Sequence, residues 1–501
     1  MSELFEQLKP HLERAYAFQT ALRAISWDNS TLAPREAIEN TSKAIGILSG
    51  EEYKAQVNDE VKGLLKELEA PGEQEKLNDS ERALVRKMGK GLRKLEKIPA
   101  EEYQAYSELL AKSYPVWEQA KNNNDYASFA PVLQEVISSQ KRFRRYQQEE
   151  GQTLYDVALD EYEEGFTVEI LDDFFGKLRT ALVPLIKQIR EKQELVQDGF
   201  LNQNYPIEKQ KELCRFLAEY IGFDFNRGVM AESEHPFTTN FHNHDVRITN
   251  HFHEDRLDFA CFSVIHEGGH ALYEQGIDDG ITMTPIGEGT SMGMHESQSR
   301  FYENNLGRSR AFWMPIYHKV QELFPEQLGG VGLEEFYRAI NKSAPSLIRT
   351  EADELTYPFH VMIRYEIEKM IFQGEVSVEE LPAVWNRKYQ EYLGVSPDSD
   401  TNGILQDMHW SGGSFGYFPS YALGSAIAAQ ICHHIKQVMP LEEYLEAKNL
   451  AAVREYLKEH IHKYGGARNT QELLLAMTGE AFNPDYYIAY LTEKYTELYQ
   501  L

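Results

Sequence analysis

Two histidines and a glutamate lie close together in the stretch FSVIHEGGHALYEQG, which runs from Phe262 to Gly276. In a helix, His266 and His270 are one turn apart on the same face, so both ring nitrogens can reach one zinc ion. Glu267 lies about 100° around the helix from His266, where it can move a proton from water to a leaving amine without being a ligand. The pattern therefore predicts a zinc-dependent hydrolase. The alternative is a core helix with two satisfied histidines.

A catalytic zinc site also needs a third protein ligand and one open position. The segment MGMHESQSRFYENN supplies Glu296 at the start of the next expected helix, after a loop that can bring this helix back beside the first. Its neighbour His295 is the competing ligand. Spacing alone favours Glu296, but a carboxylate at a helix start is also stabilised by the helix dipole, or can simply face solvent.

The elements that must position these residues are mostly helical. From residue 2 to about 227, apolar residues recur at three- and four-residue spacing, with short breakers between the runs. Between about 232 and 253 the sequence alternates and is rich in Thr, Phe and His, which predicts a small β-ribbon. Helices are expected to resume at about 256–275, 291–306, 309–323, 356–373, 377–393, 418–438, 442–460 and 483–499. The first of these helices has Asp258 as its N-cap candidate and Gly276 as its C-cap candidate.

The chain has no internal repeat and no long linker, so we expect one domain over residues 1–501. Its helical N-terminal part would extend to residue 230, and its catalytic part would cover 231–501. Histidines concentrate just before the metal-binding pattern, which indicates a polar cleft, ordinary surface histidines being the alternative. These residues are His235, His242, His244, His251 and His253.

The net charge of −28 argues against nucleic acid or an anionic membrane as a partner, because both are bound through basic patches. Cys214, Cys261 and Cys432 are far apart and form no CxxC pattern, so a disulfide framework is not expected and a reducing compartment fits. No stretch reaches 18 apolar residues, and the N-terminal segment has no apolar signal core. We therefore expect a soluble cytoplasmic protein.

Six short motifs, in order along the chain, resemble those of the thermostable carboxypeptidase (carboxypeptidase Taq) family of zinc metallopeptidases. The segment around Trp27 and Asp28 is similar to that family as well, so the resemblance covers nearly the whole chain. The six motifs are His235-Pro236-Phe237, Asp245-x-Arg247-x-Thr249, His266-Glu267-x-x-His270, His295-Glu296-Ser297-Gln298, Ile348-Arg349-x-x-Ala352-Asp353 and Gly403-x-x-Gln406-Asp407-x-His409-Trp410.

The resemblance implies a mainly α fold with a deep active-site groove, similar to the neurolysin and angiotensin-converting-enzyme type. It also implies a homodimer, a bound Zn²⁺ for which Co²⁺ can substitute, and removal of single residues from peptide C-termini with broad specificity and poor release of proline. Carried over to this chain, the metal ligands are His266, His270 and Glu296, and the catalytic base is Glu267. The choice of Glu296 over His295 rests on this likeness.

A carboxypeptidase must recognise the free terminal carboxylate, which arginine does best through two parallel hydrogen bonds. Arg349 is the first candidate, although it can instead pair with Asp353 one helical turn on. Arg247 is the second, and it can instead pair with Asp245 on one face of a strand. His235 is expected to hydrogen-bond the substrate backbone or else to pack behind the ribbon.

The oxyanion formed during peptide hydrolysis usually needs a further hydrogen-bond donor. The glycine-rich segment HWSGGSFGYFPSYALG offers Tyr421 as the favoured donor, with His409 and Tyr417 in the substrate pocket or supporting it. Packed aromatic residues in a loop are the alternative. Gln406 and Asp407 are expected to orient a zinc ligand through a hydrogen bond or only to stabilise this loop.

Two other functions remain open for the sequence: an endo-acting zinc oligopeptidase and a catalytically inert helical binding scaffold. The two arginine motifs favour the exopeptidase, and the intact Glu267 argues against the scaffold. Each helix-interior glycine costs about 1 kcal/mol against alanine, so Gly268 and Gly269 require a reason. The helical wheel places Gly268 away from the metal, where another helix can approach, and Gly269 on a flank that leaves room for the Glu296 helix or the peptide.

Overall fold

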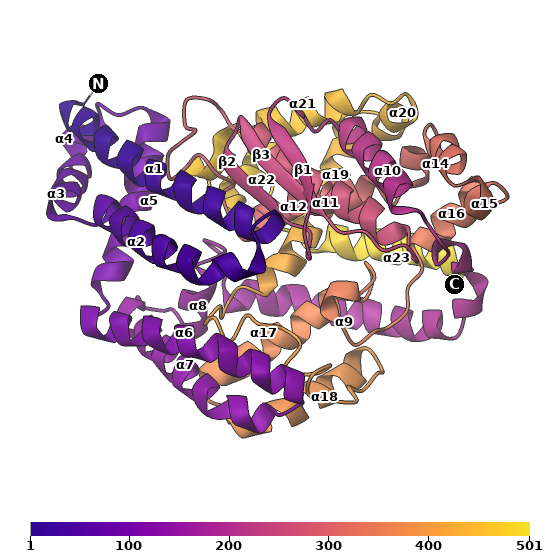
Figure 1. Cartoon of the computed structure of the whole chain (residues 1–501), viewed down its shortest axis with the longest axis horizontal. Helices are drawn as coiled ribbons and strands as arrows, with labels where there is room; N and C mark the ends of the chain where they lie inside the picture. The colour runs from indigo at the N-terminus through magenta and orange to yellow at the C-terminus, as the bar shows by residue number, and fades with distance from the viewer. Residues whose placement is uncertain (1) are drawn as a thin grey trace.

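A computed structural model describes residues 2–501 of the chain as a mainly helical protein (Figure 1). Its helices begin where the sequence provides caps. In α5, for example, the Asn78 side chain accepts from the Glu81 backbone N–H, and the Glu81 carboxylate accepts from the Asn78 backbone N–H. This exchange satisfies two otherwise free N–H groups. The apolar stripe of α5 then packs into the interior through residues such as Leu84 and Val85.

The elements follow one another as predicted over most of the chain. The N-terminal helices are α1 Glu3–Thr31, α2 Ile38–Gln56, α3 Asp59–Leu68, α4 Pro71–Gln74, α5 Asp79–Glu96, α6 Ala100–Asn123, α7 Tyr126–Gln147, α8 Leu154–Leu159, α9 Val168–Arg190 and α10 Ile207–Ile221. After the strands come α11 Asp258–Gln275, α12 Met292–Arg300, a π-helical turn Phe301–Leu306, α13 Arg310–Trp313, α14 Tyr317–Leu323, α15 Pro325–Leu328 and α16 Leu333–Ile340. The last helices are α17 Tyr357–Gln373, α18 Leu381–Tyr392, α19 Pro419–Val438, α20 Leu441–Glu446, α21 Leu450–His460, α22 Thr470–Thr478 and α23 Asp485–Tyr499.

The expected β-ribbon is a three-stranded sheet in the order β1-β3-β2. The strands β2 Thr238–His242 and β3 Asp245–Asn250 lie inside the segment predicted as a ribbon and form an antiparallel hairpin. The strand β1 Gly228–Glu232 begins before the predicted ribbon and pairs with β3 in parallel. Parallel strands are joined by long connections and not by a tight turn, so no local turn pattern in the sequence predicts the pairing of β1 with β3.

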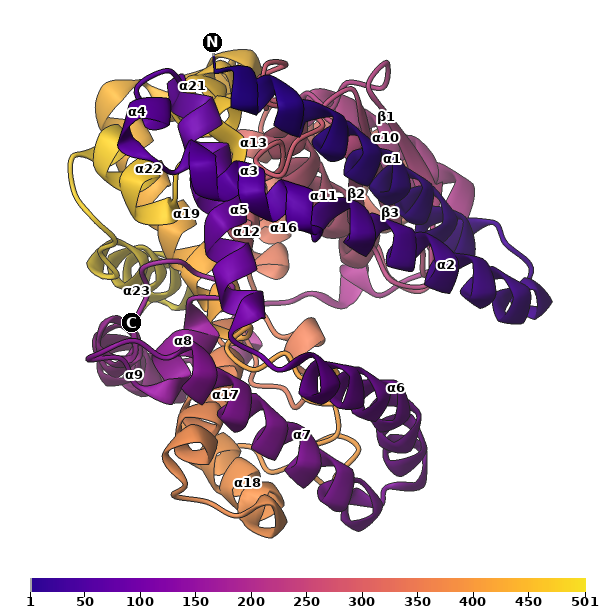
Figure 2. The ribbon, with the colours of Figure 1, turned by 90° about the vertical axis from the view of Figure 1, so that its left-hand side faces the viewer.

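Two hydrophobic clusters hold the molecule together. The larger one extends from Tyr106 to Tyr499 and includes α11, α12, α17 and α19. The smaller one joins α1, α3 and α5 to the loop that contains Ile277, Ile281 and Ile286. Figure 2 shows α5 running from the part that contains α1 towards α6 in the other part of the molecule.

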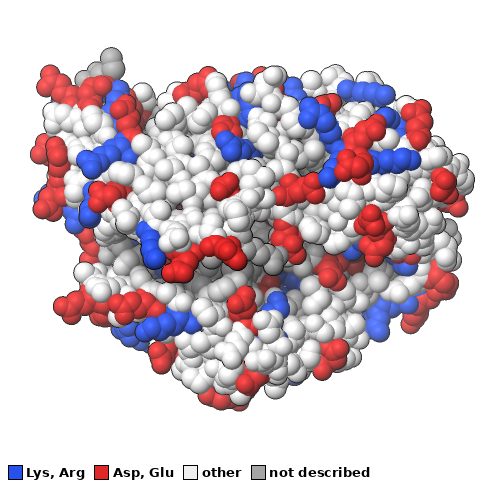
Figure 3. Space-filling model, viewed as in Figure 1, with Lys and Arg blue, Asp and Glu red and all other residues white. Residues whose placement is uncertain are grey.

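A hollow crosses the face of the molecule between the part that contains α1 and α2 and the part that contains α6 and α7 (Figure 3). Acidic and basic side chains are scattered over this face rather than gathered by sign. All three cysteines are buried and free. Among residues 2–501, no helix combines the length and the apolar character needed to cross a membrane.

Candidate active site

The two histidines of the HExxH pattern lie in the middle of α11, a helix that ends where the sequence predicts. Gly276 is its C-cap residue, and a Cβ there would lie 2.6 Å from His462 Cβ and 2.7 Å from His462 Nδ1. The predicted N-cap is wrong, however. Leu257 occupies that position, and Asp258 instead accepts two hydrogen bonds from the Arg256 guanidinium.

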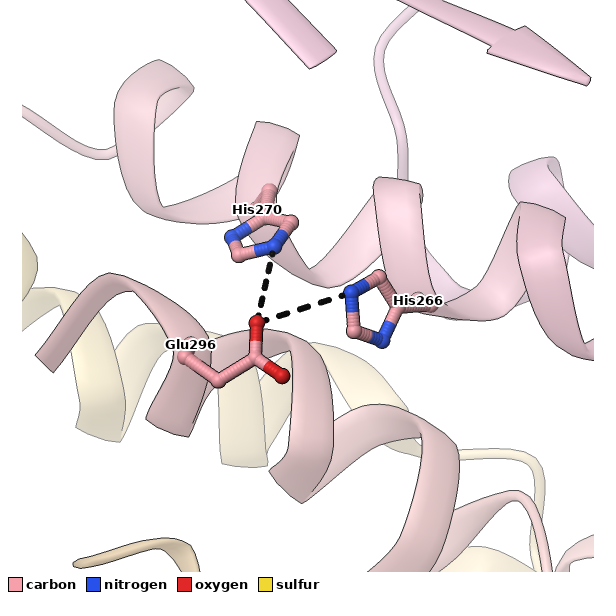
Figure 4. A group of neighbouring side chains, drawn as sticks. All are labelled: His266, His270 and Glu296. Atoms are coloured by element: carbon pink, nitrogen blue, oxygen red, sulfur yellow. Dashed lines mark ion pairs between the residues drawn. The ribbon is translucent and has the colours of Figure 1, made fainter. Parts of the chain in front are cut away.

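His266, His270 and Glu296 point towards one another from α11 and α12 (Figure 4). One carboxylate oxygen, Glu296 Oε2, lies 3.6 Å from His266 Nε2 and 3.5 Å from His270 Nε2. Tetrahedral ligands that bind zinc at about 2.0–2.1 Å are about 3.3 Å apart. The observed spacing therefore fits a metal ion at the centre of this group.

The protonation of two members of the group suits a metal. Burial lowers the pKa of His270 to about 3, which leaves its ring neutral. Burial opposes ionisation of Glu296, but Arg300 and the two histidines outweigh it and hold the pKa of this carboxyl well below its usual range. A neutral imidazole and a carboxylate are the forms that bind divalent metals. For the third member, His266, burial lowers the pKa but Glu296 and Glu303 outweigh burial and raise the pKa, so metal binding at this ring would release a proton.

Glu303 orients the first histidine, a contact that the sequence reasoning missed. Its carboxylate accepts a hydrogen bond from His266 Nδ1 at 2.9 Å, and it also pairs with Arg300 and Arg308 at 3.2 Å each. A hydrogen bond of this kind fixes the tautomer, so that Nε2 is free to bind a metal. The available signal was the seven-residue spacing from Glu296, which places both carboxylates on one helical face.

His295 supports the second histidine and is not part of the metal-binding group. Its Nδ1 lies 2.6 Å from His270 Nδ1, and its Nε2 lies 2.7 Å from Glu274 Oε1. One proton on each ring, directed from His270 to His295 and from His295 to Glu274, satisfies both contacts. Glu274 is held in turn by the Asn240 side chain and the Gly289 backbone N–H.

Glu267 is positioned by β2, one of the two edge strands of the sheet. Thr238 on β2 donates to Glu267 Oε2 at 2.6 Å, a second contact that the sequence reasoning missed although Thr238 directly follows the His-Pro-Phe motif. Burial raises the pKa of Glu267, and the neighbouring His266 and the Thr238 hydrogen bond partly offset this effect. The carboxylate lines a cleft of about 440 Å³ together with His266, Arg300 and Tyr357.

The two glycines of α11 provide clearance on separate faces, as the helical wheel predicts. A Cβ at Gly268 would clash with the tip of Ile221 on α10. A Cβ at Gly269 would lie 2.6 Å from Ser299 Cα and 2.8 Å from the Gln298 carbonyl oxygen, both in the α12 backbone. Of the two reasons considered for Gly269, the structure supports room for the Glu296 helix.

Arg349 lies buried beside the cleft and is held by Asp407, not by Asp353. Its Nε and Nη2 donate to Asp407 Oδ1 at 3.1 and 2.9 Å, and its Nη1 lies 3.3 Å from the Tyr357 hydroxyl. Asp407 also accepts from Arg364 Nε at 2.6 Å. The expectation that Gln406 and Asp407 orient a metal ligand finds no counterpart in these contacts, because both residues bind the two arginines instead.

Three residues of the glycine-rich segment meet next to Arg349. The Tyr421 hydroxyl lies 3.3 Å from His409 Nε2, and the Tyr417 and Tyr421 ring centroids are 5.2 Å apart. The Arg349 guanidinium lies over the Tyr421 ring at 4.7 Å from its centroid. Burial lowers the pKa of His409 to about 4, so this ring is neutral at pH 7.

Two predicted residues lie apart from this group. Arg247 on β3 forms both of its short hydrogen bonds, each 2.8 Å, with Asp245, and its guanidinium lies over Phe241. This is the structural pairing considered as the alternative. His235 lies exposed in the turn between β1 and β2, so it does not pack behind the sheet.

A mainly helical fold with a buried His–His–Glu group and an adjacent carboxylate defines a metallopeptidase. The model of the family described as "Carboxypeptidase Taq (M32) metallopeptidase" matches residues 7–495. The chain therefore belongs to the carboxypeptidase Taq family and is a peptide hydrolase.

Proteins similar to this chain over its whole length support the assignment. "Carboxypeptidase 1" of Bacillus subtilis (strain 168) is 42% identical over 500 residues, which are 100% of this chain and 98% of the relative. "Thermostable carboxypeptidase 1" of Pyrococcus furiosus is 34% identical and is matched over 99% of both chains. The crystal structure of the M32 carboxypeptidase from Deinococcus radiodurans R1 has a TM-score of 0.96, with 34% identity and 100% of both chains covered.

Proposed function

We propose that this protein is a zinc-dependent carboxypeptidase that removes single residues from peptide C-termini, with broad side-chain tolerance and poor release of proline. The observation that carries the proposal is the convergence of His266, His270 and Glu296 beside Glu267, in a chain of this family. Two imidazoles and a carboxylate form a donor set typical of catalytic zinc, and cobalt can occupy the same set. When bound, such an ion polarises carbonyl groups and lowers the pKa of water.

The proposed role of Glu267 is that of general base and then general acid. Its buried position raises its pKa, which favours uptake of a proton from the attacking water. The Thr238 hydrogen bond holds the carboxylate in one orientation without supplying positive charge. The same carboxyl group then gives the proton to the leaving amine, so that Glu267 returns to its starting state.

Arg349 is the residue that we propose to bind the terminal carboxylate of the substrate. Asp407, itself bound by Arg364, holds the Arg349 guanidinium in place, which reduces the entropy lost when a substrate binds. Arg247 contacts Asp245, Phe241 and Trp27, none of which lines the cleft beside Glu267, whereas Arg349 contacts Tyr357, which does. The contribution of Arg247 is therefore proposed to be stabilisation of the sheet. His235 stays a proposed contact to the substrate backbone, since it is exposed just before β2.

We propose Tyr421 as the donor to the developing oxyanion. Its hydroxyl is part-buried near Arg349, and burial raises its pKa, so it keeps its proton at neutral pH. His409 is proposed to set the orientation of this hydroxyl through their 3.3 Å contact. Tyr417 packs against Tyr421 and is proposed to border the substrate.

The proposed assembly is a homodimer in a reducing, cytoplasmic environment, with the whole chain acting as one domain. The three free cysteines are consistent with such an environment. Sedimentation analysis at several concentrations tests the dimer directly.

Mass spectrometry of a defined peptide mixture, with and without a chelator, tests the function. Stepwise loss of C-terminal residues that stops in the chelator is expected, and C-terminal amidation of a peptide should abolish its turnover. Glu267→Gln should keep the metal, measured by elemental analysis, and lose most of the rate. Near-wild-type turnover by Glu267→Gln would refute its assignment as the base.

A further inference from the structure

A second cavity, of about 410 Å³, lies between α1, α3 and α5, which are side by side in Figure 2. Its volume is in the range of ligand-binding pockets. Most of its wall is apolar, and Tyr103 of α6 and Pro285 of the loop before α12 also line it. We call it the α5 pocket, and its principal apolar wall residues are Leu12, Tyr16, Val61, Leu65, Met88 and Leu92.

The wall of the α5 pocket and the residue Glu267 both contact the edge strand β2. The Tyr16 hydroxyl, in the pocket wall, donates to the Phe241 carbonyl oxygen of β2. Thr238, three residues earlier on this strand, donates to Glu267. At about 3.3 Å per residue, the two contacts are about 10 Å apart along β2.

The pocket lies on the opposite side of the metal-binding group from Arg349. Tyr357, which contacts Arg349, lies under the Arg300 guanidinium at the C-terminal end of α12. Towards the pocket side lies Glu274, one turn beyond His270, and its charge acts on both Tyr16 and Lys87 in the pocket wall. A peptide whose last carboxylate is at Arg349 would therefore extend its preceding residues towards this pocket.

We propose that the α5 pocket binds an apolar side chain of the peptide substrate, about three residues before the scissile bond. This inference rests on the proposed carboxypeptidase function, since it needs the substrate to be anchored at Arg349. The distance along β2 sets the position, because an extended peptide advances at the same rise per residue as a strand. The apolar wall sets the preference for an aliphatic or aromatic side chain.

The chain offers a position in the pocket wall where an added Cβ meets no neighbouring atom. Gly91 on α5 lines the pocket, and a Cβ at this position would meet no atom within 4 Å. Gly91→Leu should therefore fold normally and occupy the space of the substrate side chain. Gly63→Leu on α3 is the matched control, because Gly63 is equally open, lies inside a helix and is not part of the pocket wall.

The experiment compares kcat/KM for N-acetylated peptides with the same last residues and Gly, Leu or Phe three positions before the scissile bond. A short N-acylated dipeptide, which cannot reach the pocket, serves as reference. The wild-type protein and Gly63→Leu should prefer Leu or Phe over Gly by about tenfold or more. Gly91→Leu should lose this preference and keep its rate on the dipeptide.

The possible outcomes separate this inference from the proposed function. A wild-type protein that releases no C-terminal residue even from the dipeptide contradicts the proposed function. A wild-type protein that cleaves all peptides without preference at this position, or a Gly91→Leu variant that keeps the preference, overturns the pocket assignment. A change in oligomeric state of Gly91→Leu with unchanged peptide preference assigns the pocket to a second copy of the chain and equally overturns it. The wild-type series decides the question alone if Gly91→Leu does not fold.

Discussion

Replacing Gly269 by alanine should separate α11 from α12 and weaken metal binding, whereas the same change at Gly268 should not. The reason is the kind of atom that each new methyl group meets. At Gly269 these atoms belong to the backbone of Ser299 and Gln298, which cannot rotate away. At Gly268 the obstacle is the terminal methyl group of Ile221, which can move to another rotamer.

The size of each effect follows from these contacts. Carbon atoms pack best at about 3.5–4.0 Å, so the 2.6 Å approach of a Gly269 Cβ to Ser299 Cα requires a shift of about 1 Å. Overpacking of this kind costs about 1–3 kcal/mol, and alanine returns about 1 kcal/mol through helix propensity. For Gly268→Ala, a rotamer cost of about 0.5–1.5 kcal/mol nearly cancels the same gain.

Metal affinity should reveal the difference more clearly than stability. His266 and His270 come from α11 and Glu296 from α12, so a 1 Å separation of the helices far exceeds the tolerance of about 0.2 Å for metal–ligand distances. Gly269→Ala should lose at least about tenfold in affinity, measured by competition with a chromophoric chelator, and Gly268→Ala should bind like the wild type. Equal affinity for the two variants, with similar urea unfolding curves, would refute this reasoning.

Further expectations concern the residues that support the site. Glu303→Ala should lower metal affinity by about 10–100-fold. His295→Phe should have the same effect and should also shift the absorption bands of the cobalt-substituted protein. Chelator competition measures both affinities, and an unchanged affinity would contradict the proposed orienting role of the residue replaced. Asp407→Asn should destabilise the protein by about 3–5 kcal/mol in urea unfolding, because it leaves two buried arginines without their carboxylate. Burial raises the pKa of Glu163 to about 7, so the folded state binds a proton that the unfolded state releases at a lower pH. The stabilising contribution is complete below about pH 4.5 and is lost as the pH rises through about 7. Glu163→Gln should therefore be more stable than the wild type by about 3 kcal/mol at pH 8 and not at pH 4, and parallel pH profiles of urea unfolding would contradict this.

Local pattern was enough to locate the helix α11 and most of the helical body. The four-residue spacing of His266 and His270 and the cap at Gly276 are properties of one continuous segment, and periodicity records them directly. The wheel positions of Gly268 and Gly269 could be predicted for the same reason. Splits within expected helices, such as the break between α20 and α21, depend on tertiary packing and were missed.

Contacts between distant segments could not be predicted from pattern. The pairing of Arg349 with Asp407 joins residues 58 positions apart, and helical spacing alone pointed to Asp353 instead. The parallel strand β1 lies outside the segment with the alternating pattern. The six-motif resemblance placed Arg349, Gln406 and Asp407 among the important residues but gave no information about which of them touch.

The edge strand β2 contacts both the proposed base, Glu267, and Glu274, which supports a proposed metal ligand through His295. Thr238 and Asn240 alternate onto the same face of the sheet and reach Glu267 and Glu274, which are two turns apart on α11. Glu274 holds His295, and His295 holds His270. The position of this single strand therefore determines the orientation of the proposed base, Glu267, and of the residues that support the proposed ligand His270. A substrate lying along β2 would therefore be held by the same strand that positions Glu267 and, through Glu274 and His295, supports His270. The position of the cleaved bond and the geometry of the metal ligands would both depend on β2.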